Sequence, residues 1–530
     1  LMNSIKTTGK FAVMSIGRVQ GPALHLIVDK EKQIQAFKPT PYWQIFATIN
    51  DGKNQLEVKH IKDITKKEEL DKFDKLKNKK AEAETKKTKQ VITPPAPFDL
   101  TSLQTEAYKF HGITPANALA VAQKLYLAGL ISYPRTSSQK IPDLKEADKV
   151  LKRLGKEYPS LTKEITRKKP IEGNKSDPAH PAIIPTGTHS NRLTDYDEKI
   201  YNLIVKRFIS CYCSDAELEN KKINVEVDKL KFNARGMEVK TAGWMKVYPT
   251  KMEEKEVRDF NGEVNIDKIK IEEKETKPPR RFSPASIVTA LEKKNLGTKA
   301  TRANIIETLY DRNYVKDKSI KATELGIRLI DTLKKYSEVI IDEKLTREIE
   351  KDMDIIRGSK HDLEKKEEST IKKAEIALTK ISKDFKKNEK AIGKELRGAN
   401  EAAWAQEKED NKLLECHACK KGHLSLRFTP RFKSYFVGCN AYPDCTQTYP
   451  LPSGCVVKKL EDKMCEECGW PMLIRFKQGK RPWIFCFNPK CPTRLELDAN
   501  GNNKKPEARY SGKKPKTKPE KKIADVGIKK

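Results

Sequence analysis

A tyrosine and an arginine lie two positions apart, at Tyr133 and Arg135, with a proline between them. Pro134 fixes its own φ and disfavours a helical conformation for Tyr133, so the segment is predicted to be extended. Side chains two apart in an extended segment share a face, which would place the phenol beside the guanidinium. This pair suits attack on a phosphodiester, because the guanidinium can orient the phosphate and stabilise the charge that develops. The alternative is a core tyrosine with an arginine at the surface.

A histidine lies between two prolines in a second segment, Asp177-Pro-Ala-His-Pro-Ala-Ile-Ile-Pro-Thr186. The prolines favour a stiff loop rather than a helix around this residue. His180 could therefore hydrogen-bond a phosphate oxygen, or the oxygen that departs when a strand is broken. The alternative is a loop histidine without a chemical role.

Cations at two predicted helix starts form a third feature. Arg18 precedes Gly21-Pro22, a plausible helix start, and helix N-termini attract phosphate. The linker Gly297-Thr-Lys-Ala-Thr301 offers backbone N–H groups, a cation and hydroxyls in the same way. We therefore predict nucleic-acid contacts at four residues, Arg18, Lys299, Thr301 and Arg302. The alternatives are a solvent-facing arginine and a plain helical hairpin with a glycine turn.

The cysteines indicate metal binding. Of 11 cysteines in the chain, those between Cys416 and Cys491 include two sets with short spacings. The two sets are Cys416, Cys419, Cys439 and Cys445, and Cys465, Cys468, Cys486 and Cys491. Four thiolates per set predict two structural Zn²⁺ sites, with an iron–sulfur cluster as the competing hypothesis. Cys455 is left unassigned, and Cys211 and Cys213 are interpreted as core residues. Such spacing is typical of a reducing compartment.

Aromatic and cationic residues alternate around both cysteine sets. This mixture is typical of surfaces that stack on unpaired bases, although some of the rings must cover the metal sites. The residues are Arg427, Phe428, Arg431, Phe432, Lys433, Tyr435, Phe436, Trp470, Phe476, Arg481, Trp483 and Phe485.

The composition predicts a polyanionic partner. The chain has 530 residues, 107 of them Lys or Arg, and a formal net charge of +33. Nucleic acid is the first choice, and an anionic membrane surface is the weaker one because the aromatics are scattered. No apolar run approaches the ~20 residues of a membrane span, and no secretory h-region is visible. We expect a cytoplasmic, nucleoid-associated protein, and the initial Leu1 suggests a piece of a longer chain.

Periodicity and turn residues predict the secondary structure of the chain. Helices are expected at 62–90, from Thr114 to Gly129, at 195–210, from Ser283 to Gly297, at 302–311 with Thr301 as N-cap, and over most of 340–400. Strands are expected at 42–49 with a hairpin turn at 50–52, at 223–227, at 243–247, and as a small hairpin at 314–323. The segment 281–336 is predicted to resemble a helix-turn-helix.

Five of these segments, in order along the chain, resemble motifs of type IA DNA topoisomerases, the single-strand-passing enzymes. The segments are Ser15-Ile-Gly-Arg-Val-Gln, Gly129-Leu-Ile-Ser-Tyr-Pro-Arg-Thr, Ala179-His-Pro-Ala-Ile-Ile-Pro, Ala242-Gly-Trp-Met-Lys-Val-Tyr-Pro, and Arg281-Phe-Ser-Pro-Ala-Ser through Asp311-Arg-Asn-Tyr-Val315. C-terminal zinc ribbons are a common appendage in that family.

The resemblance implies that Tyr133 attacks a DNA phosphodiester and forms a 5′-phosphotyrosine, so that the strand reopens and reseals without ATP. Arg135 would position the scissile phosphate, and His180 would contact the phosphate backbone near the break. Arg18, Lys299 and Thr301 would hold the single strand in a groove. The substrate would be negatively supercoiled DNA with single-stranded segments.

The resemblance also implies a multidomain α+β fold, a toroid with a helical groove domain, a β-rich arch and a lid that carries the tyrosine, followed by zinc ribbons. The expected domains are 1–40 (start of the groove domain), 41–97 (first arch part), 98–194 (lid), 195–280 (second arch part), 281–400 (helical groove domain), 401–455 and 456–503 (zinc ribbons), and 504–530 (basic disordered tail). Family members carry an N-terminal Toprim domain that holds Mg²⁺, to which nothing in the chain corresponds. A Toprim half is therefore expected upstream in a longer protein or on a separate subunit.

Two departures from the family pattern concern the predicted site. Ser137 stands where many members have Asp, and Thr298-Lys299 resembles archaeal sequences rather than the Arg-Pro of bacterial ones. The rival hypothesis is a non-enzymatic DNA-binding protein that uses the helix-turn-helix-like segment and the ribbons. The topoisomerase half of a reverse gyrase is a further alternative, and a tyrosine recombinase fits less well.

Overall fold

The structure, a computed structural model, describes residues 15–188, 193–358, 361–429, 432, 434–477 and 482–492. The chain divides into two units, Leu1–Ala403 and Trp404–Lys530. In the first unit the buried apolar side chains of the described residues form three separate cores, named here after the domains expected from the sequence. The lid core draws on residues 98–154, 183–216 and 244–248, the groove core on 23–28, 287–341 and 392–399, and the barrel core on 43–83, 223–234 and 257–266. In the second unit they gather around cysteines.

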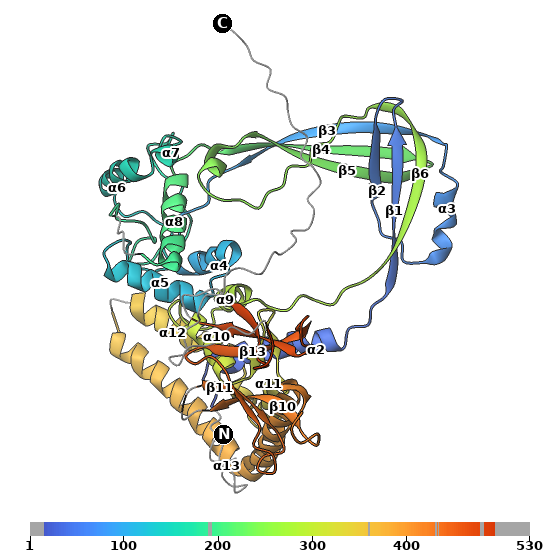
Figure 1. Ribbon diagram of the computed structural model, residues 1–530. Coiled ribbons are helices and arrows are strands. Elements are labelled where there is room, and N and C mark those ends of the chain that lie inside the picture. Colours follow the sequence, from blue (N-terminus) through green and yellow to red (C-terminus); the bar gives the residue numbers. More distant parts are fainter. Residues whose placement is uncertain are drawn as a thin grey trace. The chain divides into compact units, whose positions relative to one another are not determined.

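Six antiparallel strands close into a barrel in the order β1-β2-β5-β4-β3-β6 (Figure 1). They come from two distant stretches of the chain, namely β1 (Pro41–Asn50), β2 (Gln55–His60) and β3 (Lys80–Ile92), then β4 (Ala216–Val227), β5 (Leu230–Thr241) and β6 (Gly262–Glu275). In β1 every second residue from Trp43 to Ile49 is buried, as expected of a strand with one face on a core. The predicted strand at 42–49 and the hairpin turn after it are confirmed.

The helix predicted at 62–90 is wrong. That stretch holds the short helices η1 (Lys67–Glu69) and α3 (Asp71–Asp74) and then the strand β3. Lysine and glutamate favour a helix locally, but β3 pairs with β4 on one edge and with β6 on the other. Ala81 and Ala83 enter the barrel core, while their charged neighbours Lys80, Glu82 and Glu84 are exposed. Pairing across the barrel therefore overrides the local helical preference.

The lid core is built by helices that surround the tyrosine segment. They are α4 (Leu100–His111), α5 (Pro115–Leu127), α6 (Leu144–Glu157), α7 (Pro159–Thr162), α8 (Asp195–Ser210) and the 3₁₀ helix η2 (Gly243–Lys246). The predicted start and end of α5 are confirmed: the Thr114 hydroxyl accepts the Asn117 N–H, and Gly129 follows the helix with φ +70°. The helix predicted at 195–210 is confirmed as α8.

Helix α8 contributes its buried side chains to the lid core, together with Cys211 and Cys213, which are core residues as predicted. The second set of barrel strands begins only after this helix, with β4 at Ala216. The expected second arch part, 195–280, thus contains a helix that packs with the lid. We propose that the lid includes residues up to Cys213.

The strand predicted at 243–247 is wrong, because this segment forms the buried turn η2. Gly243 has φ +48°, and a Cβ there would lie 2.2 Å from the carbonyl oxygen of Asp215. The chain must therefore approach itself more closely than a strand allows. Trp244 and Tyr248 then reach the lid core, and the Trp244 indole donates a hydrogen bond to the Ile92 carbonyl at 3.0 Å.

The groove core joins the start of the first unit to its last helices. Its elements are α2 (Gln20–Gln35), α9 (Pro284–Lys293), α10 (Arg302–Asp311), β7 (Val315–Lys316), β8 (Lys321–Ala322), α11 (Glu324–Tyr336), η3 (Glu338–Ile340) and α13 (Leu363–Asp410). Helix α12 (Glu343–Gly358) lies between η3 and α13 in the chain. Arg281 donates to both carboxylate oxygens of the buried Glu31, at 2.8 and 2.9 Å, and so ties the segment before α9 to α2. The predicted helix at 302–311 and the small hairpin are confirmed.

The second unit contains two small antiparallel sheets, each carrying one cysteine set. The first has the order β12-β11-β10-β9, from β9 (Lys412–Glu415), β10 (His423–Thr429), β11 (Ser434–Cys439) and β12 (Thr448–Pro450). The second has the order β13-β14-β15, from β13 (Val456–Met464), β14 (Pro471–Phe476) and β15 (Trp483–Cys486). Within the part of the chain that the structure describes, no helix is long and apolar enough to span a bilayer.

Replacing Gly243 with alanine is expected to lower the free energy of unfolding by about 2–4 kcal/mol, because the new Cβ meets the Asp215 carbonyl at a positive φ. Gly262→Ala is the matched control, since Gly262 also has a positive φ, +86°, but no atom lies within 4 Å of its Cβ position. The free energy of unfolding of the control is expected to fall by only about 1 kcal/mol. Urea unfolding followed by circular dichroism measures both, and equal losses would contradict the steric explanation.

Candidate active site and metal centres

The tyrosine segment is held against the loop that carries His180. The Ser132 N–H donates to the Ile184 carbonyl at 2.9 Å, and its hydroxyl donates to the Ala182 carbonyl at 2.8 Å. Ile131 and Pro185 form an isolated antiparallel bridge beside them. Helix α5, which is followed by Gly129, fixes the chain just before Ser132. The lid core therefore positions both the tyrosine segment and the histidine loop against which it lies.

Tyr133 and His180 are brought together. Their ring centroids lie 4.4 Å apart with the planes tilted by 47°. Tyr126, near the end of α5, contacts Tyr133 edge-on at a centroid distance of 5.2 Å. The Tyr133 and His180 side chains are only partly buried, so the phenol is not sealed in the core. The pair can therefore meet a ligand from solvent.

Arg135 carries an unsatisfied donor. Its Nε atom is buried and has no hydrogen-bond partner among the described residues. A buried guanidinium N–H without an acceptor is costly, and a phosphate oxygen is an acceptor of suitable charge and geometry. The chemistry of this side chain thus fits the predicted role of an anion-binding group.

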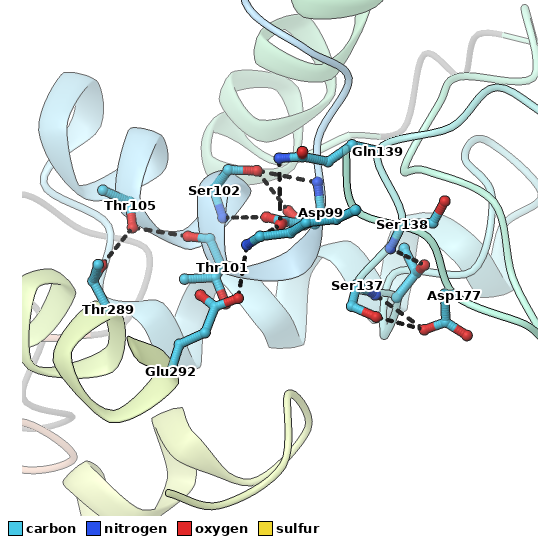
Figure 2. Close-up of polar contacts among 12 residues, drawn as sticks. Asp99, Thr101, Ser102, Thr105, Ser137, Ser138, Gln139, Asp177, Thr289 and Glu292 are labelled. Atoms are coloured by element: carbon cyan, nitrogen blue, oxygen red, sulfur yellow. Dashed lines mark hydrogen bonds and ion pairs between the residues drawn. The ribbon is translucent and has the colours of Figure 1, made fainter. Parts of the chain in front are cut away.

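Asp177 connects the tyrosine segment, the histidine loop and the groove, and the sequence interpretation gave it no role. Its carboxylate accepts the N–H and the hydroxyl of Ser137, at 3.1 and 3.0 Å (Figure 2). It also accepts the Ala179 N–H at 3.1 Å. It also forms an ion pair with Lys299. Burial by itself raises the pKa of Asp177, but the Lys299 ammonium and the Ser137 and Ala179 donors outweigh it and hold the pKa below its ordinary value. The carboxylate is therefore charged at neutral pH.

The available signal for this role was the departure at Ser137. The Ser137 hydroxyl, expected to differ from the family pattern, donates to a carboxylate from the histidine loop. Ser137 and Asp177 lie 40 residues apart, so no local sequence pattern predicts that they pair.

A second polar contact joins the lid to the groove helices. Lys175 forms ion pairs with Asp99, the N-cap of α4, at 2.9 Å and with Glu292 of α9 at 2.8 Å. Thr105 of α4 and Thr289 of α9 add a hydroxyl contact at 3.5 Å (Figure 2). These contacts hold α4 and α9 beside each other without merging the lid core and the groove core.

A polar cavity of about 240 Å³ lies between the tyrosine segment and the groove helices. Thr136 and Ser137 contribute from the lid, and the groove side contributes Asn295, Gly297, Thr298, Lys299, Arg302, Glu350, Asp354 and Arg357. Two of the four predicted nucleic-acid contacts, Lys299 and Arg302, therefore lie at one cavity with the tyrosine segment.

Arg302 lines this cavity, but its Nε atom donates to the Leu296 carbonyl at 3.2 Å. Burial lowers the pKa of its guanidinium, which nevertheless stays charged at neutral pH. Thr301 is the N-cap residue of α10, as predicted, but its hydroxyl does not cap the helix and instead accepts the Thr298 N–H at 3.0 Å within the turn. Thr301 thus shapes the turn that carries Lys299.

Arg18 precedes α2, as predicted, and its guanidinium donates to Glu350 of α12 at 2.7 Å. Glu350 is also a wall of the polar cavity. Arg18 is thus linked to the site through an acidic partner, in the same way that Lys299 is paired with Asp177. The roles of all these residues toward DNA stay predictions.

The cysteines form two groups of four whose sulfur atoms lie within 4.8 Å of one another. The grouping is the predicted one, Cys416, Cys419, Cys439 and Cys445, and Cys465, Cys468, Cys486 and Cys491. Closest sulfur pairs are 3.8 and 3.7 Å apart in the first set and 3.6 and 3.5 Å apart in the second. A tetrahedral Zn²⁺ with Zn–S bonds of ~2.3 Å requires sulfur separations of ~3.8 Å, so both sets fit zinc with every position filled.

Several of the predicted stacking residues pack against one another near the second cysteine set. Trp483 and Phe485 are stacked at 5.0 Å, and the Arg475 guanidinium lies over Trp483 at 4.5 Å. Trp470 packs against Phe487 in the core beside the first set, so it covers the metal region as expected. Arg431, Lys433 and Arg481 lie outside the described residues.

A family model described as DNA topoisomerase matches residues 1–366. The chain belongs to the type IA DNA topoisomerases. A model described as a topoisomerase DNA-binding C4 zinc finger matches residues 414–454 and 462–500, which contain the two cysteine sets. The two structural zinc sites of this topoisomerase family member are thereby confirmed.

Relatives of the chain come from archaea and bacteria. DNA topoisomerase 1 of Methanothermobacter thermautotrophicus is 41% identical over 93% of this chain and 67% of its own length. The Methanocaldococcus jannaschii enzyme of the same name is 39% identical over 93% of this chain and 64% of its own length. The chain thus spans about two thirds of the length of these relatives.

A solved structure of full-length topoisomerase I from Thermotoga maritima has a TM-score of 0.54 and 24% identity, over 85% of this chain and 73% of that chain. This likeness shows the fold alone. The predicted fold class, a multidomain type IA topoisomerase architecture followed by zinc ribbons, is confirmed.

Replacing Cys416 with serine is expected to lower the zinc content of the purified topoisomerase chain from two ions to one, because a set of three thiolates holds the ion poorly. Cys455→Ser is the matched control, since the Cys455 thiol donates to the Pro452 carbonyl and belongs to neither set. Mass-spectrometric metal analysis gives the stoichiometry. Loss of zinc from the Cys455 variant would contradict the assignment.

Proposed function

We propose that this chain is the strand-cleaving core of a type IA topoisomerase that relaxes negatively supercoiled DNA. The Tyr133 oxygen attacks a phosphorus of one DNA strand, the bond from phosphorus to the 3′-oxygen breaks, and a 5′-phosphotyrosine forms. The phenol gives up its proton and the departing 3′-oxygen takes one up. Storing the bond energy in the phosphotyrosine removes the need for ATP.

The observation that carries the proposal is the position of the Tyr133 phenol. It is partly exposed, lies against the His180 ring, and belongs to the segment that holds Arg135 with its unpartnered Nε. In the proposal Arg135 orients the scissile phosphate and stabilises its developing charge, and His180 contacts the backbone beside the break. Lys299 and Arg302 hold the single strand at the polar cavity, with Arg18 and Thr301 supporting the same groove.

Resealing is proposed to involve a Toprim half, with its Mg²⁺, supplied upstream in the same protein or by a separate subunit. Among the described residues, the groups of three or more side chains able to hold an ion are the two cysteine sets. Those thiolates do not fit Mg²⁺, which prefers oxygen ligands, so no step here is derived from magnesium. The proposed substrate implies a nucleoid-associated protein.

Tyr133→Phe is expected to abolish covalent trapping of DNA, a loss on the order of a thousandfold or more, because no other group replaces the attacking oxygen. The measurement is denaturing electrophoresis of protein mixed with a 3′-end-labelled single strand, since a 5′-phosphotyrosine retains the labelled fragment.

Tyr196→Phe is the matched control, because this tyrosine is exposed on α8 and is not placed at the site. Adduct formed by the Tyr133 variant would refute the assignment of the nucleophile. Absence of adduct from the unchanged protein, even with a Toprim half added, would favour a non-enzymatic DNA-binding protein.

Arg135→Lys is expected to slow adduct formation by about 10²- to 10³-fold while changing the Kd for single-stranded DNA much less. Lysine keeps the charge but loses the planar fork that would orient the phosphate. Single-turnover trapping gives the rate, and fluorescence anisotropy gives the Kd. Arg153→Lys serves as the control in the same lid, where the arginine donates to the Thr186 carbonyl. A parallel fall in binding and rate would contradict a role in positioning the scissile phosphate.

A further inference from the structure

The Lys299 ammonium, predicted to bind a DNA phosphate, already has an anionic partner in this structure. Asp177 of the lid forms an ion pair with it, and the Asp177 side chain is 3% exposed while that of Lys299 is 30% exposed. Lys299 lies on the turn before α10, where backbone N–H groups also favour an anion. A strand phosphate and the Asp177 carboxylate therefore compete for the same cation.

Polar groups join the lid to the groove helices. The lid core and the groove core are separate apolar clusters. The contacts described between them include the Asp177–Lys299 pair, the Lys175–Glu292 pair and the Thr105–Thr289 contact. Ion pairs with a partly exposed partner are weak and reversible, unlike a merged apolar core.

Asp177 can lose Lys299 without becoming an unsatisfied buried charge. The Ser137 N–H, the Ser137 hydroxyl and the Ala179 N–H still donate to its two oxygens. Lysine in turn can leave the carboxylate for a phosphate while remaining paired with a negative charge. The exchange of partners therefore leaves no orphaned charge on either side.

We propose that Asp177 is a positioning residue that pairs with the Lys299 ammonium when no DNA is bound. A phosphate of the single strand then replaces the Asp177 carboxylate as the partner of Lys299. Strand binding in the groove then breaks one of the ties that hold the tyrosine-bearing lid to the groove. By linkage, the intact tie weakens strand binding to the same extent. This inference rests on the proposed function, since it requires a single strand in the groove.

The test is a double-mutant cycle on the full chain, with the Kd for fluorescein-labelled (dT)12 measured by anisotropy. Asp177→Asn removes the charge and keeps one oxygen, which can accept either from Ser137 or from Ala179, because these donors meet different carboxylate oxygens. It is expected to lower the Kd by about three- to tenfold, because Lys299 becomes free for phosphate. Lys299→Gln is expected to raise the Kd, and adding Asp177→Asn to Lys299→Gln is expected to change it less than about twofold.

Asp331→Asn is the control for net charge, because Asp331 pairs with Lys32 on the groove helices, away from the lid. The inference is overturned if Asp177→Asn leaves the Kd unchanged or raises it. It is also overturned if Asp177→Asn lowers the Kd equally in the Lys299→Gln background, or if Asp331→Asn lowers the Kd as much as Asp177→Asn does. A purely structural role of Asp177 predicts weaker binding in both backgrounds. If the unchanged chain fails to bind (dT)12, the proposed function itself fails.

If Asp177→Asn does not fold, Asp177→Ser carries the same cycle, since its hydroxyl can still accept the Ala179 N–H in a local turn. Circular dichroism establishes that each variant is folded, and a zinc content of two per chain establishes that the second unit is intact.

Discussion

One buried carboxylate connects the parts of the chain on which the site depends. Asp177 receives donors from the tyrosine segment, from its own histidine loop and from the groove turn. A charge with so little exposure is stable only when its lone pairs are satisfied, so each of the three segments is constrained by the same group. The relative positions of Ser137, Ala179 and Lys299 follow from that constraint.

The surrounding architecture makes the tyrosine segment rigid and keeps the lid separate from the groove helices and the barrel. Rigidity comes from the lid core, where α5 ends at Gly129 and the following segment bonds to the loop from Ala182 to Ile184. Separability comes from having three apolar cores in the first unit instead of one. The barrel is a closed sheet built from strands on both sides of the lid in sequence, so the lid is an insertion between barrel strands β3 and β4. A closed sheet has no edge that could pair elsewhere.

The second unit is stabilised in another way. Its sheets have three and four strands, and the apolar residues around them are few and interleaved with cysteines. Sheets of this size bury too little surface to be stable without an additional constraint, which two tetrathiolate zinc sites supply. The stacked Trp483 and Phe485 pair, with Arg475 over it, is only partly buried in this scaffold.

Local sequence determined the features whose cause lies within a few residues. Helix α5 follows from Thr114, Pro115 and Gly129, helices α8 and α10 follow from their periodicity, and the two zinc sites follow from cysteine spacing. The ordered motifs also identified the family and the segments that carry Tyr133, Arg135 and His180.

Tertiary structure decided the features whose cause lies far away in the chain. Strand β3 has the composition of a solvated helix and becomes a strand because two distant strands pair with its edges. The turn at Gly243 replaces a strand because the backbone near Asp215 leaves no room for a Cβ. The partner of Ser137 and Lys299 is Asp177, 40 and 122 residues away, and no local pattern encodes that contact. Pairing, packing and charge neutralisation between remote segments act only once the chain has folded, which is why the sequence alone did not reveal them.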